Sequence, residues 1–272
     1  MEATGTALVT GASRGIGRAV AVELARQGFD VVATMRDPAM GDGLAEAAGG
    51  SGSLRVERLD VTDPASIRLP EGLRVLVNNA GVEDDNLPVE VMALEVWRRL
   101  FETNVFGLVA VTRAAVPILR AGGGGVICNI TSSSILAPVP FLGAYRASKA
   151  AVSALGESLQ AEVAQFAIRV VEVLPGPIET DMLAASDRPA AAVEHSAYRL
   201  LAERTWANRQ QVREHYTPAA EAARRIAAAI LDDGGPLRYG CDPLAEEMLT
   251  LWRSVASDED WLGPMLETYG SA

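Results

Sequence analysis

The sequence predicts an α/β fold, a doubly wound and mostly parallel sheet of about seven strands with helices on both faces. Short runs rich in Val, Ile and Leu alternate with longer helical patterns along the whole chain. Several of these runs are almost continuously apolar, which is typical of parallel strands covered on both faces. A glycine-rich loop directly follows the first run.

Each element is predicted from where its pattern starts and stops. The predicted strands cover residues 7–10, 31–34, 55–59, 75–78, 126–130, 169–174 and 237–239. The predicted helices cover residues 14–27, 88–101, 106–120, 145–166 and 218–231, and from Asp242 onward one amphipathic helix is followed by an acidic end. Repeated β-α-β units then place the strands side by side and parallel.

Two connections depart from this alternation. Residues 60–74 leave room for about one helical turn between Pro64 and Pro70, whereas a parallel crossover usually needs about a dozen residues or more. Residues 181–216 form a charged, partly apolar insertion after the sixth strand. Ligands bind beyond the carboxyl ends of the strands in such sheets, so we expect this insertion to be a substrate lid. We expect residues 1–272 to form one domain that includes it.

Composition limits the partners that the chain can have. Its 272 residues include 24 basic and 35 acidic side chains, and the net charge of −11 opposes nucleic acid and anionic membranes. No run of about eighteen apolar residues predicts a spanning helix, and the first strand begins too early for a signal peptide. Cys128 and Cys241 have neither disulfide-scaffold nor metal-ligand spacing. We expect a cytoplasmic protein without a bound metal.

The loop after the first strand reads Thr-Gly-Ala-Ser-Arg-Gly-Ile-Gly over residues 10–17. Gly11, Gly15 and Gly17 allow a tight turn, close backbone approach and an uncrowded helix start. The helix then presents unpaired N–H groups and its positive dipole end to a pyrophosphate. An ordinary glycine-rich turn is the alternative, but the position at the first β-α junction favours a dinucleotide site.

The end of the second strand indicates which dinucleotide binds. An acidic residue there would accept the 2′-hydroxyl of NAD, but the first charged residue is Arg36, and Arg14 lies in the glycine loop. Two guanidinium groups can bind a 2′-phosphate, so the sequence favours NADP(H) over NAD(H). Asp37 leaves an alternative open, because it could turn inward or pair with Arg36.

Tyr145 and Lys149 stand four residues apart, so a helix places the phenol and the ammonium on one face. A cation beside a phenol is expected to lower the tyrosine pKa from its usual value near ~10. Such a tyrosine can exchange a proton with a carbonyl or an alcohol. The spacing also occurs in ordinary surface pairs, so alone it is weak evidence.

Together these features resemble the short-chain dehydrogenase/reductase family over residues 7–180. The resemblance rests on Gly11, Ser13, Arg14, Gly15, Ile16 and Gly17, on Asp60 and Val61, on Asn78, Asn79, Ala80 and Gly81, on Asn104, on Ser132, Tyr145 and Lys149, and on Pro175, Gly176, Pro177, Ile178, Glu179 and Thr180. It implies a Rossmann-fold ketoreductase or alcohol dehydrogenase. Residues 32–37 are further similar to the NADP-preferring branch that includes 17β-hydroxysteroid and retinol dehydrogenases.

The resemblance also implies a role for each catalytic residue. Tyr145 would give its proton to the carbonyl oxygen as hydride arrives from the nicotinamide, and Ser132 would hold that oxygen. Lys149 would bind the nicotinamide ribose and depress the pKa of Tyr145. The freed main-chain carbonyl of Asn104 would hold a water of the proton relay. Ser133 competes with Ser132, as does its neighbour Ser134, but the thirteen-residue spacing to the tyrosine favours Ser132.

The remaining motif residues would bind the cofactor. By the same resemblance, Asp60 and Val61 would hold the adenine, Asn79, Ala80 and Gly81 would lie along its ribose, and Pro175, Gly176, Ile178 and Thr180 would contact the nicotinamide carboxamide. The family usually has a full helix within residues 60–74. We interpret its loss as a harmless deletion, the alternative being an exposed sheet surface for a partner.

The substrate is indicated only by apolar residues. Residues 135–142 lie between Ser132 and Tyr145, and Met182 and Leu183 begin the insertion. They predict an apolar or bulky ketone or secondary alcohol if they line the site, and ordinary packing if they do not. We expect a homodimer or homotetramer. The alternative function is a non-catalytic NADP-binding sensor or interaction protein on the same fold, and an epimerase or dehydratase is disfavoured.

Overall fold

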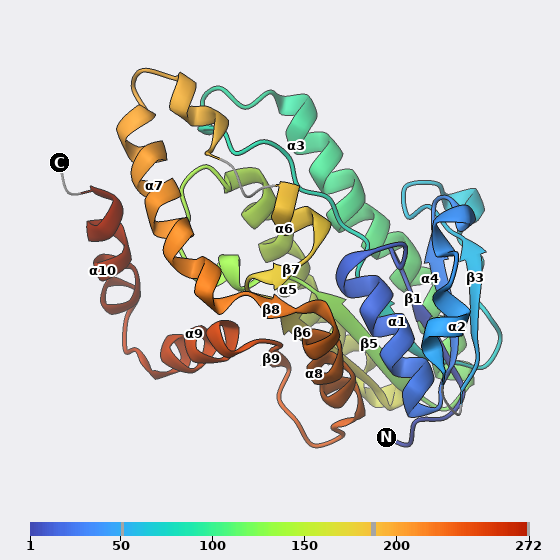
Figure 1. Ribbon diagram of the computed structural model, residues 1–272. Helices are drawn as coiled ribbons and strands as arrows, with labels where there is room; N and C mark the ends of the chain where they lie inside the picture. The colour runs from blue at the N-terminus through green and yellow to red at the C-terminus, as the bar shows by residue number, and fades with distance from the viewer. Residues whose placement is uncertain (50–51, 186–188, 271–272) are drawn as a thin grey trace.

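Seven parallel strands form one sheet in the order β3-β2-β1-β4-β5-β6-β9 (Figure 1). The computed structural model describes residues 1–49, 52–185 and 189–270. The strands are β1 (Thr6–Val9), β2 (Asp30–Met35), β3 (Leu54–Arg58), β4 (Leu73–Asn78), β5 (Gly125–Ile130), β6 (Ile168–Leu174) and β9 (Arg238–Gly240). The predicted doubly wound sheet is therefore confirmed, and its order reverses between β1 and β4, where such folds bind ligands.

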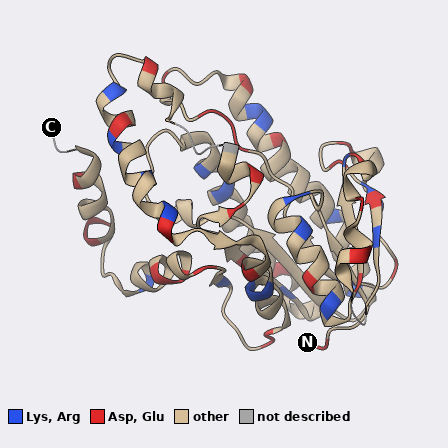
Figure 2. Cartoon of the chain, in the orientation of Figure 1, with Lys and Arg blue, Asp and Glu red and all other residues tan. Residues whose placement is uncertain are grey.

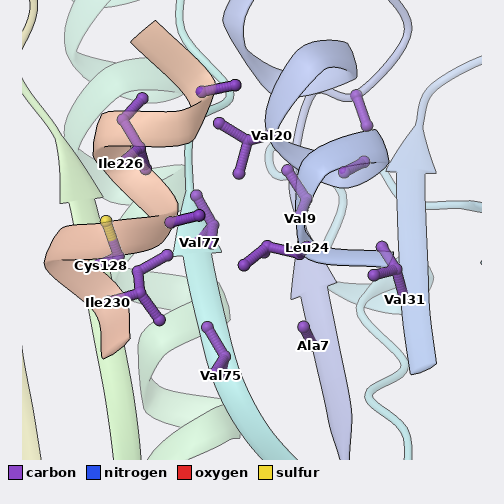
Figure 3. Close-up of a cluster of buried hydrophobic side chains, with 14 of the residues drawn as sticks. Ala7, Val9, Val20, Leu24, Val31, Val75, Val77, Cys128, Ile226 and Ile230 are labelled. Atoms are coloured by element: carbon purple, nitrogen blue, oxygen red, sulfur yellow. The ribbon is translucent and has the colours of Figure 1, made fainter. Parts of the chain in front are cut away.

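Helices cover both faces of the sheet. On one face, α1 (Gly15–Gln27) and α8 (Ala219–Leu231) pack Leu24 and Ile226 against Ala7, Val75 and their neighbours (Figure 3). On the other face, α4 (Leu108–Ala121) and α5 (Gly143–Val163) pack against Leu8 and its neighbours. Successive residues of a strand point to opposite faces. Both faces are buried over the central strands, which explains why β1, β2, β4 and β5 are almost continuously apolar.

The helical run from α3 (Leu94–Phe101) into α4 contains a π-helix at Glu102–Gly107. The predicted start of the earlier helix at Pro88 is wrong, because the carbonyl of Pro88 closes a turn and the helix begins at Leu94. In the described part of the chain, Leu94–Ala121 is the one helical run long and apolar enough to cross a membrane. Its buried side chains pack on the sheet, as those of a core helix do.

The short crossover within residues 60–74 contains a single 3-10 turn at Pro64–Ser66. Asp63 caps this turn by accepting a hydrogen bond from the amide of Ala65. Ile67 and Leu69 then pack against the core cluster beneath α4 and α5. Extended chain therefore covers the sheet where a helix is missing, which favours the harmless deletion.

The insertion at residues 181–216 contains α6 (Asp181–Ala185), a 3-10 turn (Ala191–Glu194) and α7 (Arg199–Val212). Both its ends are joined by a small parallel pair of strands, β7 (Ile178–Glu179) and β8 (Thr217–Pro218). The insertion thus begins and ends at the same small two-stranded sheet, β7 and β8 (Figure 1).

The C-terminal segment forms two helices, α9 (Pro243–Ser254) and α10 (Asp258–Gly270), so the predicted single helix with an acidic end is wrong. The acidic residues 258–260 form the first turn of α10, where negative charge complements the helix dipole. The indole N–H of Trp261 donates to the carbonyl of Leu136 at 2.6 Å. The short α2 (Leu44–Ala48) is a further helix that the sequence did not predict.

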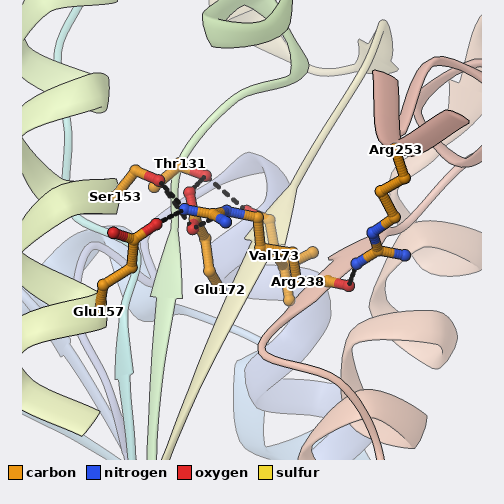
Figure 4. Close-up of polar contacts among 7 residues, drawn as sticks. All are labelled: Thr131, Ser153, Glu157, Glu172, Val173, Arg238 and Arg253. Carbon is orange, nitrogen blue, oxygen red and sulfur yellow. Dashed lines mark hydrogen bonds and ion pairs between the residues drawn. The ribbon is translucent and has the colours of Figure 1, made fainter. Parts of the chain in front are cut away.

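Polar contacts attach the last strand to the sheet. Glu172 of β6 is only 1% exposed, and its carboxylate accepts hydrogen bonds from Thr131, Ser153 and Arg238 at 2.9 Å each (Figure 4). Arg238 of β9 also pairs with Glu157 of α5. The buried carboxylate is therefore compensated, as a buried charge must be. Elsewhere, charges of both signs lie along α3 and α7 (Figure 2).

Candidate active site

A cavity of about 560 Å³ lies where the strands end beneath the insertion. It collects nearly all the predicted site residues, namely Gly11, Ser13, Arg14, Gly15, Ile16, Arg36, Asp60, Val61, Asn79, Ala80, Gly81, Ser132, Tyr145, Lys149, Pro175, Gly176, Ile178 and Thr180. Two predicted residues, Gly17 and Asn104, are buried behind its wall. The topology thus brings residues from the whole first two thirds of the chain to one edge of the sheet.

The glycine loop can fit a dinucleotide because its glycines have no side chains that would obstruct the backbone. Gly11 has a φ of +66°, and a Cβ there would lie 2.8 Å from the Cα of Ala80. A Cβ on Gly17 would clash with the side-chain amide nitrogen of Asn79. No side chain caps the start of α1, and its first turn carries no acid. The backbone therefore has the close approach and the helix N-terminus that a pyrophosphate needs.

Hydrogen bonds tie this loop to the segment after β4. The side-chain amide of Asn79 donates to the carbonyls of Thr10 and Gly11 at 2.9 and 3.1 Å. The hydroxyl of Thr10 accepts from the backbone N–H groups of Asn79 and Ala80 at 3.0 Å each. The two walls of the cofactor cleft therefore hold each other in place.

At the far end of the cleft, Arg36 and Asp60 line the wall. Burial acts to raise the pKa of Asp60, but hydrogen bonds from Thr62 and the charges of Arg36 and Arg58 outweigh it and lower the pKa. Asp37 instead accepts a hydrogen bond from the amide of Ala39 and caps its own turn. Of the two charges at the end of β2, the arginine is the one that lines the cavity.

The α5 helix carries Tyr145 and Lys149 on one face, with the ammonium 5.9 Å from the centre of the phenol ring. Ser132 lines the same cavity, and its hydroxyl acts to lower the pKa of the phenol. The amide of Ser133 instead donates to the carbonyl of Pro175. Lys149 donates to the carbonyl of Ile130 at 2.9 Å. The three predicted catalytic side chains therefore meet in the cavity.

The expected lowering of the Tyr145 pKa is wrong. Burial raises the pKa of this phenol well above its ordinary value, and the charge of Glu83 raises it further, whereas the Ser132 hydrogen bond opposes the rise. Burial lowers the pKa of Lys149 to about 8, against a smaller opposing effect of Glu83. Burial therefore decides the direction of both pKa shifts, because removing each group from water disfavours its charged form.

Asn104 sits in the π-helix and is 1% exposed. Its carbonyl oxygen accepts from the amide of Val82 at 2.8 Å, and its amide donates to the carbonyl of Val82 and the hydroxyl of Ser148 at 3.0 Å each. A π-helix marks a local break in the α-helical ladder, which fits the freed main-chain carbonyl that the family resemblance implies at Asn104. The side chain connects the loop after β4 to α5.

Several residues of the site carried no signal in the sequence. Glu83 and Arg209 line the cavity from the loop after β4 and from α7. Asp242 lies outside the wall but accepts from the amide of Gly176 at 2.6 Å, which anchors the Pro175–Gly176 turn. No motif surrounds these positions, and only the folded topology brings them to the site. The predicted apolar residues Phe141, Leu142, Met182 and Leu183 also line the cavity.

A sequence profile described as short chain dehydrogenase matches residues 5–190 of the chain. The chain belongs to the short-chain dehydrogenase/reductase family. It is 39% identical over 190 residues to the uncharacterized oxidoreductase YusZ of Bacillus subtilis, a match covering 66% of this chain and 67% of that protein. It is 38% identical over 191 residues to retinol dehydrogenase 8 of Bos taurus, which covers 66% of this chain and 61% of that protein.

Solved structures of this family share the fold. A short-chain dehydrogenase from Streptomyces avermitilis is 33% identical, with a TM-score of 0.75 and 92% of each chain covered. An enzyme from Burkholderia cenocepacia in complex with NADP is 26% identical, with a TM-score of 0.72, covering 93% of this chain and 95% of that one. One from Burkholderia phymatum in complex with NAD is 25% identical, with a TM-score of 0.74 and 93% of each chain covered. Neighbours of this short-chain dehydrogenase thus bind either nicotinamide cofactor.

Proposed function

We propose that this short-chain dehydrogenase is an NADP(H)-dependent oxidoreductase that interconverts a ketone and a secondary alcohol, with Tyr145 as the acid and base. The observation that carries the proposal is the meeting of Ser132, Tyr145 and Lys149 in one cavity with the glycine loop. A nucleotide-binding loop beside a phenol, a hydroxyl and an ammonium is the equipment of carbonyl reduction.

The residues would divide the chemistry in the following way. The bound nicotinamide supplies a hydride in reduction and accepts one in oxidation. Tyr145, whose raised pKa keeps it protonated near neutral pH, donates its proton to the carbonyl oxygen. Ser132 donates a hydrogen bond to the same oxygen and stabilises its developing charge. Lys149 holds a positive charge beside the phenol after the phenol has lost its proton. Asn104 fixes the loop after β4 through its hydrogen bond with the amide of Val82.

The choice of NADP(H) is supported by the charges at the adenosine end. Arg36 lines the cavity there, and Asp37 does not. Arg14 also lines the cavity, and its Nε lies 3.9 Å from a carboxylate oxygen of Asp181. A 2′-phosphate would give both guanidinium groups an acceptor. These residues also support a place in the NADP-preferring branch.

The substrate that the cavity favours is an apolar or bulky ketone. Phe141, Leu142, Met182, Leu183 and Trp206 give the cavity that holds Tyr145 an apolar lining. We propose that the insertion at residues 181–216 is a lid over this cavity, to which it contributes Met182, Leu183 and Trp206. Relatives named estradiol 17-beta-dehydrogenase 2 and retinol dehydrogenase 8 support a bulky, apolar substrate.

A screen of carbonyl compounds, followed by NADPH and NADH oxidation, tests the proposed function. We expect at least one bulky apolar ketone to be reduced faster than small polar ones, and faster with NADPH. The non-catalytic alternative predicts cofactor binding without turnover of any carbonyl or alcohol. It is not favoured, because all four predicted catalytic residues are present and Ser132, Tyr145 and Lys149 converge.

Two further proposals concern the protein in the cell. We propose a homodimer or homotetramer, because Val91, Leu94 and Phe106 leave 42–63% of their surface exposed around α3 and the π-helix. Light scattering of the purified chain measures the oligomeric state, and a monomer would contradict this proposal.

We also propose a cytoplasmic location, because both cysteines are free and buried. Fractionation of cells would test it.

A further inference from the structure

Glu83 lies in the loop after β4 and lines the same cavity as Tyr145 and Lys149. Its position is fixed through its neighbour. The side chain of Asn104 holds the backbone of Val82 from both sides, with hydrogen bonds of 2.8 and 3.0 Å to its N–H and carbonyl. The carboxyl group therefore projects from a backbone that cannot easily move.

The same loop passes close to the ammonium of Lys149. A Cβ added to Gly81 would lie 3.4 Å from the Nζ of Lys149 and 3.3 Å from the side-chain oxygen of Asn104. The chain that leads to Glu83 is thus packed against both buried groups. An acid held at this place acts on the phenol and the ammonium through a medium that screens charge poorly.

A cation faces Glu83 from the insertion. Arg209 of α7 lines the same cavity. Burial raises the pKa of the Glu83 carboxyl, and the charges of Arg209 and Lys149 oppose the rise, in that order. The Glu83 carboxylate therefore shares the cavity with one cation of the core and one of the insertion, and both act on it.

We propose that Glu83 is a positioning residue for Tyr145 and Lys149, fixed by Asn104 and balanced by Arg209 of the insertion, and that it sets the pH range of turnover. The inference rests on the proposed function for its meaning in catalysis. Its electrostatic part can be tested without a substrate.

The charged and titratable groups on the cavity wall are few. In the described ranges they are Arg14, Arg36, Asp60, Glu83, Tyr145, Lys149, Asp181, Arg209, Tyr216 and Tyr269. Of these, Glu83 is the one whose charge raises the pKa of both Tyr145 and Lys149. Without its charge, both groups are expected to lose their protons at lower pH. The basic limit of ketone reduction and the acidic limit of alcohol oxidation would then move in the same direction.

The sequence makes a direct measurement possible, because Lys149 is the only lysine in the chain. Protein grown with lysine labelled with ¹³C at the ε-carbon would give a single side-chain signal, and its chemical shift reports the protonation of Lys149. We expect the wild-type protein to titrate near pH 8. In Glu83→Gln, which keeps the shape and removes the charge, we expect a value lower by about one pH unit.

Three variants complete the test. Glu83→Asp keeps the charge and should restore most of the wild-type pKa. Asp85→Asn makes the same charge change two residues away, off the cavity wall, and should leave it within about 0.2 units. Arg209→Met removes the balancing cation and should move the pKa of Lys149 upward. An equal Lys149 pKa in wild-type and Glu83→Gln protein, both folded by circular dichroism, would overturn the proposal.

The pH profile of turnover tests the catalytic part. With a ketone found by screening, the profile of kcat/KM for Glu83→Gln should move to lower pH in both reaction directions. If no carbonyl is turned over by wild-type protein, the proposed function fails, whereas the Lys149 titration still decides whether Glu83 acts on the pair. A shifted titration with an unmoved pH profile would overturn the catalytic role.

Discussion

At the scale of single residues, Tyr145 and Lys149 illustrate what sequence spacing can and cannot predict. Their spacing correctly placed them on one face of α5, and the thirteen residues from Ser132 correctly predicted a shared site. The direction of the phenol pKa was wrong, because burial depends on everything that packs around the pair. Glu83 was missed for the same reason.

Lys149 should make stability depend on pH. Its pKa in the folded protein is about 8, below the ordinary 10.5, so the unfolded chain binds its proton more tightly. Stability should therefore rise as pH rises through this interval. Lys149→Met should be more stable than wild-type by about 1–3 kcal/mol near pH 7, and the gap should narrow toward about pH 10.

Urea unfolding of both proteins across this range measures the gap, and effects common to both proteins cancel in the comparison. A gap that stays constant from about pH 7 to about pH 10 would show that burial does not depress the ammonium pKa.

Arg36 should decide between the two cofactors. Arg36→Ala removes a guanidinium from the adenosine end and should weaken NADPH binding by about 10–100-fold, with little effect on NADH. Titration of each cofactor by fluorescence measures both affinities. Arg55→Ala, on the outer strand β3 and paired with Glu57, serves as the control and should change neither. An equal loss for both cofactors would refute the 2′-phosphate assignment.

At the scale of elements, apolar runs predicted the strands of the main sheet and longer helical patterns predicted the core helices, whereas the shortest elements were missed. The pair β7 and β8 has only two residues in each strand, which is too few for any periodicity. The sequence predicted an acidic end where α10 forms. The side chain that anchors this helix is Trp261, and its partner Leu136 lies 125 residues away in the sequence, so no local pattern predicts the contact. Such contacts exist only once the chain is folded.

Helix α10 should stabilise the apolar loop at residues 135–142 through the hydrogen bond from Trp261 to the carbonyl of Leu136. Trp261→Phe keeps an aromatic ring but leaves the carbonyl of Leu136 without its donor, and should lower the free energy of unfolding by about 1–3 kcal/mol. It should also raise KM for the ketone while leaving NADPH affinity unchanged. Trp252→Phe, on the more exposed α9 position, should stay within about 0.5 kcal/mol of wild-type. Equal effects of the two changes on unfolding would contradict this role.

At the scale of the whole molecule, the doubly wound parallel sheet was predictable from its alternating pattern, and so was the meeting of the motif residues in one cavity, because most of that pattern and all of those motifs lie in the part of the chain that the family profile matches. The parts of the cavity wall that come from α9 and α10 were not predicted. Leu244, Met248 and Tyr269 bring these two helices to the cavity. Their sequences carry no shared motif, and their positions depend on packing against the finished sheet.

The most direct test of the central claim is Tyr145→Phe, which removes one hydroxyl group from the cavity. With a ketone that wild-type protein reduces, we predict a fall in kcat of about 10²–10⁴-fold. NADPH affinity should stay within about twofold, because the cofactor cleft is built by other residues. Tyr239→Phe, on β9 away from the cavity, should keep full activity. Turnover by Tyr145→Phe within about twofold of wild-type would contradict the assignment of Tyr145 as the proton donor.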